Sequence, residues 1–170
     1  YQGGQSITEH LIALGKRSFA FIGDNGEHAP EFKARYNGYF ETLMAHGLDK
    51  NSVQENANST EDAGSEAIKS LLQNKALPQA IVCASDLIAM GVLRALRQAK
   101  VNVPDDVAVV GYDNIAVSAY TTPSLTTVQQ NTKLAGELLV NTLLKAINNE
   151  EVEDYLMPAD IIIRQSCGSE

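Results

Sequence analysis

The sequence predicts an α/β fold in which a doubly wound, parallel sheet carries helices on both faces. Short apolar runs alternate with segments of helical periodicity along most of the 170 residues, and this alternation is typical of parallel strands joined by right-handed crossovers. One run, Val107–Tyr112, is apolar throughout, as expected of a strand covered on both faces. Hydrophobic residues make up 44% of the chain but aromatic residues only 6%, so we expect a core of Ala, Val, Ile and Leu.

The predicted elements follow from these two patterns in order along the chain. Strands are expected where the apolar runs are short, over residues 18–23, 52–57, 80–84, 107–112, 125–130 and 159–164. Helices are expected where apolar residues recur with a period near 3.6, over residues 7–14, 31–46, 63–72, 87–98 and 131–148.

Boundary signals support these helices. Gly15, which precedes two basic residues, ends the first helix, and Gly47 ends the second. Residues 59–62 resemble a capping box ahead of the third helix. Ser85 and Asp86 offer N-cap chemistry to the fourth helix.

The regular alternation of predicted strands and helices changes after Asp113. A loop reaches to Pro123 before the next strand, and an acidic, polar link over residues 149–154 separates the last helix from the last strand. We therefore expect the chain to leave the main sheet and then to return to it.

Composition and charge exclude several classes of protein. Thirteen basic against 21 acidic residues give a formal net charge of −8, which argues against direct binding to nucleic-acid phosphates. Cys83 and Cys167 lie far apart and outside any C-x-x-C arrangement, so a reducing compartment fits better than a disulfide framework. No apolar run approaches the ~20 residues of a membrane span. Tyr1–Gly4 carries neither an initiator Met nor a signal sequence, so we expect a piece of a longer protein.

Polar residues follow each of the first four strands, at the edge where parallel sheets bind ligands. These residues are Asp24, Asn25, Asn58, Ser59, Ser85, Asp86, Asp113 and Asn114. Arg35 lies about one turn into the helix after the first of these loops, so its side chain can reach the same edge. A guanidinium and a carboxylate in one cleft suit a polyhydroxylated ligand, because Arg donates in a planar fork and ionised Asp accepts from paired hydroxyls.

Spacing alone leaves other roles open for these residues. Asp113 is equally consistent with a turn or helix cap, and Arg35 fits a solvated surface position better than a ligand contact. Asp86 fits a cap better than a ligand, and Cys83 fits an inert core position.

Signals for catalysis and for metal binding are absent from the sequence. His10, His28 and His46 have no Cys, Asp or Glu partner at metal-ligand spacing, and the glycine motifs of nucleotide-binding loops are missing. No nucleophile elbow occurs, and no Cys lies beside a candidate base. We therefore expect no metal, no cofactor and no enzymatic activity.

Six stretches together resemble the effector-binding region of the LacI/GalR family of bacterial transcription regulators. They are EHLIALGKRSFAFIG (Glu9–Gly23), ARYNGY (Ala34–Tyr39), CASDLIAMGVLRAL (Cys83–Leu96), VPDDVAVVGYDN (Val103–Asn114), TPSLTTVQQ (Thr122–Gln130) and IIRQSC (Ile162–Cys167). They occur in the family's order over essentially the whole chain. The resemblance implies a fold of the type I periplasmic-binding-protein class, in which two α/β lobes enclose a ligand cleft.

On that template the chain holds an essentially complete C-terminal lobe and part of the N-terminal lobe. Residues 1–16 would be a remnant of the N-terminal lobe, and residues 17–114 most of the C-terminal lobe. Residues 115–149 would return to the N-terminal lobe, and residues 150–170 would close the C-terminal one. The rest of the N-terminal lobe and a DNA-binding helix-turn-helix would lie upstream of Tyr1.

The resemblance also implies site residues. Arg35 matches the family's ligand-gripping arginine, and Asp113 matches its ligand carboxylate. Ser85 and Gln130 match positions of polar ligand contacts. Ser59, or a near neighbour, stands where the family commonly has an aromatic that stacks on the ligand. Without that platform a source of apolar contact is lost, which indicates an effector that is smaller, more polar, or held by the other lobe.

The function implied is that of a cytoplasmic, homodimeric regulator that senses a small, sugar-like effector by lobe closure. It would contact operator DNA only through its upstream part and would have no contact with a membrane. A periplasmic sugar-binding protein of a transport system shares the fold and the cleft, and the sequence upstream would separate the two. An enzyme on a similar sheet would need a catalytic pair or metal cluster that the sequence does not contain.

Overall fold

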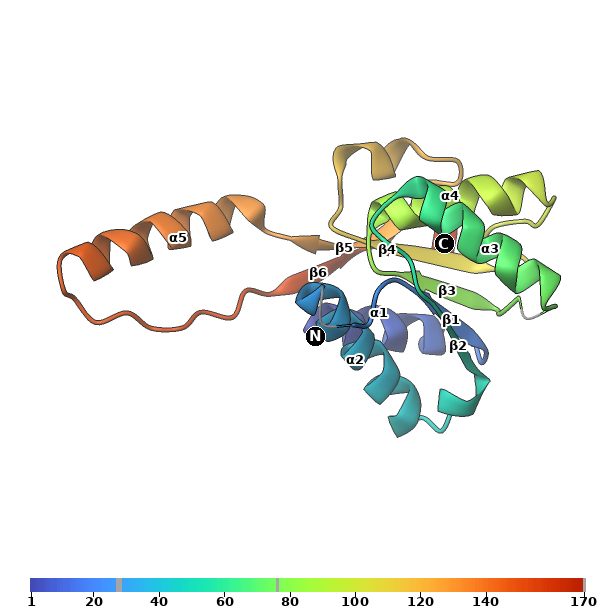
Figure 1. Ribbon diagram of the computed structural model, residues 1–170, viewed down its shortest axis with the longest axis horizontal. Coiled ribbons are helices and arrows are strands. Elements are labelled where there is room, and N and C mark those ends of the chain that lie inside the picture. Colours follow the sequence, from blue (N-terminus) through green and yellow to red (C-terminus); the bar gives the residue numbers. More distant parts are fainter. Residues whose placement is uncertain (27–28, 76, 170) are drawn as a thin grey trace.

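The computed structural model describes residues 1–26, 29–75 and 77–169. Its centre is a six-stranded sheet in the spatial order β2-β1-β3-β4-β5-β6 (Figure 1). The strands are β1 (Phe19–Ile22), β2 (Ser52–Glu55), β3 (Ala80–Cys83), β4 (Ala108–Tyr112), β5 (Thr126–Gln130) and β6 (Ala159–Ile162). All six lie where the apolar runs predict strands.

The sheet is parallel except at its last strand. β1 pairs with β2 and β3, β3 with β4, and β4 with β5, in each case in parallel. β6 runs antiparallel to β5, with Ile162 opposite Thr127. This one departure from the predicted parallel sheet has a simple cause, since a chain that leaves along β5 and comes back beside it needs no crossover over the sheet.

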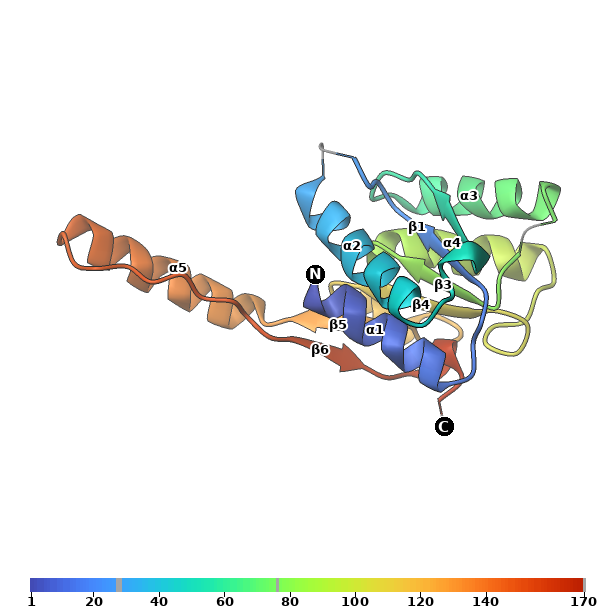
Figure 2. The same ribbon diagram turned by 90° about the horizontal axis from the view of Figure 1, so that it is seen from below.

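Helices cover both faces of the sheet in pairs. α1 (Gln2–Ala13) and α2 (Pro30–Ala45) contact each other on one face, and α3 (Glu61–Gln73) and α4 (Asp86–Gln98) contact each other on the other face (Figures 1 and 2). The doubly wound arrangement is therefore confirmed. The remaining helices are α5 (Thr132–Ile147) and the short 3-10 helices η1 (Asp49–Asn51), η2 (Ala116–Tyr120) and η3 (Gln165–Cys167).

The core lies on both sides of the central strands. Every residue of β1, β3 and β4 is buried. α1 belongs to the same core, because its Ile7 and Leu11 are fully buried. α1 also approaches α2 so closely that a Cβ on Gly4 would lie 2.2 Å from the carbonyl oxygen of Arg35. The division expected between residues 16 and 17 therefore does not follow the packing.

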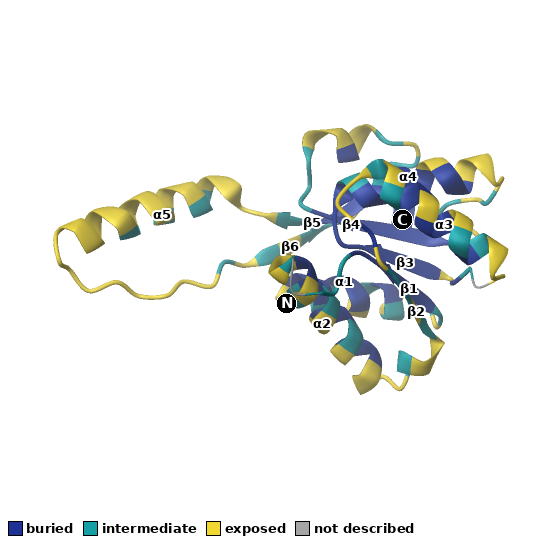
Figure 3. Cartoon of the chain, in the orientation of Figure 1, coloured by how far each residue is buried: buried dark blue, intermediate teal, exposed yellow. Residues whose placement is uncertain are grey.

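A second region stands apart from this core. β5 and β6 lead outward to α5 and to the segment 149–158, and none of the residues of α5, all of which are described, is buried (Figure 3). Large apolar side chains are nevertheless exposed in this outer region: Leu139, Val140, Leu143, Leu144, Ile147, Val152, Tyr155 and Leu156.

The change between the two regions comes later in the chain than the template implies. Residues 115–130 pack with the sheet, since Ser118, Leu125 and Thr126 are fully buried. The chain leaves the core after Gln130 and returns at Ala159, where β6 begins. The expected boundaries at residues 115 and 150 thus do not coincide with this change in packing.

Candidate functional site

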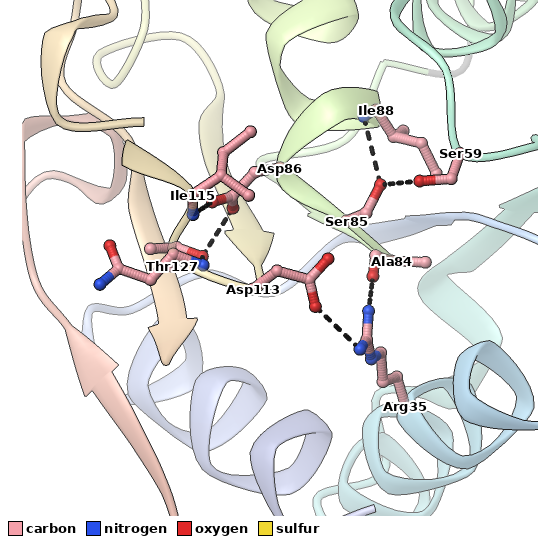
Figure 4. A network of polar contacts seen from close by, with 10 residues as sticks. Arg35, Ser59, Ala84, Ser85, Asp86, Ile88, Asp113, Ile115 and Thr127 are labelled. Carbon is pink, nitrogen blue, oxygen red and sulfur yellow. Dashed lines mark hydrogen bonds and ion pairs between the residues drawn. The ribbon is translucent and has the colours of Figure 1, made fainter. Parts of the chain in front are cut away.

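Polar groups from three parts of the chain meet at the carboxyl ends of β3 and β4, where α/β sheets bind ligands. Arg35 comes from α2, Ala84 follows β3, and Asp113 follows β4 (Figure 4). Arg35 and Asp113 are 78 residues apart in the sequence. The cleft edge predicted from the strand ends therefore does bring these two residues together.

Arg35 is buried and held on several sides. Its Nη1 donates to the carbonyl oxygen of Ala84, and its Nη2 lies 2.9 Å from a carboxylate oxygen of Asp113. The guanidinium carbon lies 3.8 Å from the centre of the Tyr112 ring and 5.4 Å from that of Phe32, a cation–π arrangement. The interpretation of Arg35 as a solvated residue, which its spacing favours, is wrong, because α2 turns this position towards the sheet.

Asp113 presents its carboxylate from an unusual turn. Its φ is 104° and that of Asn114 is 49°, so two consecutive residues adopt left-handed backbone conformations. Burial raises the pKa of Asp113, and the charge of Arg35 together with its hydrogen bond opposes that rise. The side chain of Asp113 nevertheless remains 37% exposed, so the carboxylate can still accept hydrogen bonds from a ligand.

Ser59 and Ser85 form a hydrogen-bonded pair. Their hydroxyl oxygens lie 2.8 Å apart, and Ser85 also caps α4 by accepting from the Ile88 N–H at 3.4 Å (Figure 4). α3 is capped by Thr60, whose hydroxyl accepts from the Ala63 N–H. The N-cap of α3 therefore lies one residue after the capping box predicted from Ser59, and it is a simple cap, because Ala63 at the N3 position has no side chain that could reach back. This leaves the Ser59 hydroxyl to contact Ser85.

Gln130 lies apart from these groups. It is the exposed last residue of β5 and lines a cavity of about 380 Å³ together with Tyr112 and Met157. Of the side chains described, none of the other four predicted site residues hydrogen-bonds to it. Tyr112 is the link between the two places, since it also stacks on Arg35.

Asp86 has a different role from the helix cap that its position predicts. It is fully buried, and its carboxylate accepts from the Ile115 N–H at 2.9 Å and from the Thr127 hydroxyl at 2.6 Å. Tyr112 and Thr127 contact site residues as well, although the sequence does not predict them to do so. No local signal marks them, because each acts on a residue of another element.

The described part of the chain offers little for metal or thiol chemistry. Within it, no group of three or more His, Cys, Asp or Glu side chains converges as a metal site would require. The helices of the described residues do not include one with the length and hydropathy of a membrane span. His28 lies outside the described residues. Burial raises the pKa of the Cys83 thiol well above its ordinary value, as expected of a core cysteine. His10 lies 3.6 Å from Cys167, a contact that sequence spacing does not reveal.

Comparison with known families assigns this fold. Residues 8–167 match the periplasmic binding protein-like domain. The chain belongs to this family. Its relatives identify it further as an effector-binding domain of the LacI/GalR type, as the six sequence stretches predict.

Three relatives illustrate the likeness of this LacI/GalR-type domain. The HTH-type transcriptional repressor PurR of Glaesserella parasuis is 34% identical over 174 residues, which are 96% of this chain and 51% of the repressor. A Lac repressor dimer, solved with operator and the anti-inducer ONPF, has a TM-score of 0.90 at 26% identity and is matched over 97% of this chain and 57% of its own. A sugar-binding LacI-family regulator from Escherichia coli, solved with phosphate, has a TM-score of 0.87 at 27% identity, over 97% of this chain and 60% of its own.

The LacI/GalR-type domain spans about half the length of the curated relatives it matches. These relatives are named as transcriptional repressors or regulators. Their names favour the regulator over the periplasmic transport protein that shares the fold.

Proposed function

We propose that this domain binds a small, polar effector, a sugar or related metabolite, and passes the signal to DNA-binding parts of a homodimeric regulator. The observation that carries the proposal is the Arg35–Asp113 pair, a buried guanidinium facing a partly exposed carboxylate at 2.9 Å. In this proposal the Arg35–Asp113 pair binds the effector and catalyses no reaction. Because this domain has a net charge of −8, operator DNA would be contacted by an upstream helix-turn-helix.

The chemistry of the site fits a polyhydroxylated ligand. Arg35 is held in place by Ala84 and Tyr112, so little side-chain entropy remains to be lost when it donates to ligand oxygens. Asp113 accepts from paired hydroxyls, and Ser85 with Ser59 supplies further hydroxyl groups. A serine in place of a stacking aromatic favours a compact, polar effector over one with a broad apolar face.

The outer region supports a two-lobe arrangement. We assign residues 131–158 to the N-terminal lobe, whose other residues would precede Tyr1, because their exposed apolar side chains need a covering surface. Gln130, at the crossover from β5, would then contact the effector from the lobe junction. An effector that bridges the lobes favours the closed arrangement by its differential affinity for it. We expect a coupling of about 1–3 kcal/mol to the headpieces of a cytoplasmic dimer.

Isothermal titration of the full-length protein with a panel of monosaccharides and with inorganic phosphate tests this function. For the ligand that binds, Arg35→Ala and Asp113→Ala should each weaken affinity by about 10- to 150-fold, since charged hydrogen bonds contribute about 1.5–3 kcal/mol. Arg94→Ala is the matched control, because Arg94 forms an exposed ion pair with Asp62 at 2.8 Å. Unchanged titrations in both site variants would contradict the site assignment.

A further inference from the structure

Asp86 is a buried carboxylate that lies outside the set of residues proposed to contact the effector. Both of its oxygens are engaged, Oδ1 with the Thr127 hydroxyl at 2.6 Å and Oδ2 with the Ile115 N–H at 2.9 Å (Figure 4). Gly111 in β4 leaves the room for it, since a Cβ there would lie 2.2 Å from Oδ1 of Asp86. Burying a carboxylate is costly even when it is hydrogen-bonded, so this arrangement calls for a role beyond filling space.

The two donors to Asp86 hold the turn that carries Asp113. Ile115 lies two residues beyond Asp113, and the Thr127 hydroxyl also accepts from the Asn114 N–H at 3.3 Å. The Thr127 oxygen is free to accept because its own hydrogen points to Asp86. One carboxylate therefore holds two successive backbone N–H groups, one directly and one through a hydroxyl.

This anchoring matters because the turn is unfavourable by itself. Asp113 and Asn114 have φ values of 104° and 49°, and such conformations persist only where the surroundings hold them. From this conformation the carboxylate of Asp113 reaches the Arg35 guanidinium at 2.9 Å. A relaxed turn would aim the carboxylate elsewhere.

We infer that Asp86 is a positioning residue of the effector site, which fixes the backbone of residues 114 and 115 so that Asp113 faces Arg35. Asp86 touches no ligand itself. Its importance for effector binding rests on the proposed function, whereas its action on the Arg35–Asp113 pair does not depend on a ligand.

The charges around Asp86 agree with this role. Burial raises the pKa of Asp86, and the Thr127 hydroxyl, the Ile115 N–H and the charge of Arg164 oppose the rise, while Asp113 adds to it. Arg164 also donates to the Asn114 side chain at 2.8 Å, so the same turn has a cationic anchor as well. Removing the Thr127 hydroxyl would therefore take one contact from the Asp86 anion and free the Asn114 N–H at the same time.

Thr127→Val in the full-length protein tests the inference, because valine keeps the shape of threonine and removes only the hydroxyl. The readout is the exchange of the Arg35 Nη hydrogens with solvent, followed by NMR with ¹⁵N-labelled arginine and no ligand. We expect exchange at the nitrogen facing Asp113 to become at least about tenfold faster, since the ion pair that shields it is lost. Thr127→Ser restores the hydroxyl and should restore the slow exchange.

Two further variants make the test specific. Thr8→Val removes another fully buried hydroxyl, which donates to the Gly4 carbonyl in α1, and it should leave Arg35 exchange unchanged although it also costs stability. Asp86→Leu should reproduce the effect of Thr127→Val, because leucine keeps the branched shape of aspartate but accepts neither of its two hydrogen bonds. Combining Thr127→Val with the substitution at Asp86 should give little further change, since both substitutions remove the same contact.

Unchanged Arg35 exchange in Thr127→Val or in Asp86→Leu would overturn the inference, and so would a change that Thr127→Ser does not reverse. If one of these two variants fails to fold, the other decides. The proposed function is tested separately by the sugar titrations. A protein that binds none of those sugars but shows these exchange changes keeps Asp86 as a positioning residue and loses the effector assignment.

Discussion

Helices α4 and α5 look alike in sequence but lie in opposite surroundings. Both are rich in Leu, Val and Ala, yet α4 has eight buried residues and α5 has none among its residues, all of which are described. α4 contacts α3 and the sheet, whereas α5 projects beyond the ends of β5 and β6 (Figure 3). An apolar helical pattern therefore predicts a helix but not the surface that covers it.

Hydrogen exchange of this 170-residue chain should give the largest contrast. Amides of β3 and β4 exchange through global unfolding, which costs about 5–15 kcal/mol in ordinary domains, whereas amides of α5 exchange through local fraying. We expect protection factors in the two regions to differ by at least about 1000-fold, as measured by mass spectrometry. Equal protection in α5 and β4 would show that α5 is as stably packed as the central sheet.

Matched truncations of buried and exposed side chains should give the next largest effect. Ile81→Ala, at a fully buried position of β3, should lower the free energy of unfolding by about 2–5 kcal/mol. Leu143→Ala in α5, where the side chain is 61% exposed, should change it by less than about 0.5 kcal/mol. Urea unfolding measures both values. A large loss in Leu143→Ala would show that α5 is covered within this chain.

Removing one N-cap from each region should give a smaller difference. Thr60 accepts from the Ala63 N–H at 3.2 Å, and Asn131 accepts from the Leu134 N–H at 3.0 Å. Thr60→Ala should lower the free energy of unfolding by about 1 kcal/mol, because α3 is part of the core. Asn131→Ala should leave it unchanged and instead reduce the helical circular dichroism signal as α5 frays. Equal losses of stability would argue against independent regions.

The smallest expected effect is a dependence on pH that comes from Asp113 in the core region and not from the carboxylates of α5. Burial raises the pKa of Asp113 above its ordinary value of 3.8. At a pH between that ordinary pKa and the raised pKa of the folded protein, the native state therefore binds more protons than the unfolded state. In that window this group stabilises the fold as the pH falls, while its protonation removes the ion pair with Arg35.

Effector affinity should therefore fall as the pH is lowered through the raised pKa of Asp113, before acid unfolding begins, by up to about tenfold per pH unit. Calorimetric titrations over a pH series measure this loss. Asp113→Asn should bind weakly with no such dependence, and Glu137→Gln in α5 should behave as the wild type. A pH-independent affinity in the wild type would remove Asp113 from the binding reaction.

Much of the fold could be predicted because its signals are local. The apolar run Val107–Tyr112 marked a strand covered on both faces, and Ser85 marked the start of α4 by capping chemistry that acts within three residues. Arg35 could not be placed in the same way. Its position in α2 fitted a solvated residue, and only the packing of α2 against the sheet buries its guanidinium. Arg35 was predicted as a site residue from the motif of the LacI/GalR family and not from its spacing.

Periodicity, caps and motifs act through neighbours along the chain, so the amino-acid sequence was enough to predict the order of strands and helices, the edge at which polar residues gather, and the family. The folded chain was needed to separate the roles of the two aspartates, Asp113 facing Arg35 and Asp86 holding the turn behind it. It also decided that α1 joins the core while α5 stands outside it. These outcomes depend on contacts between residues far apart in sequence and on which surfaces remain to be covered, and no local pattern carries that information.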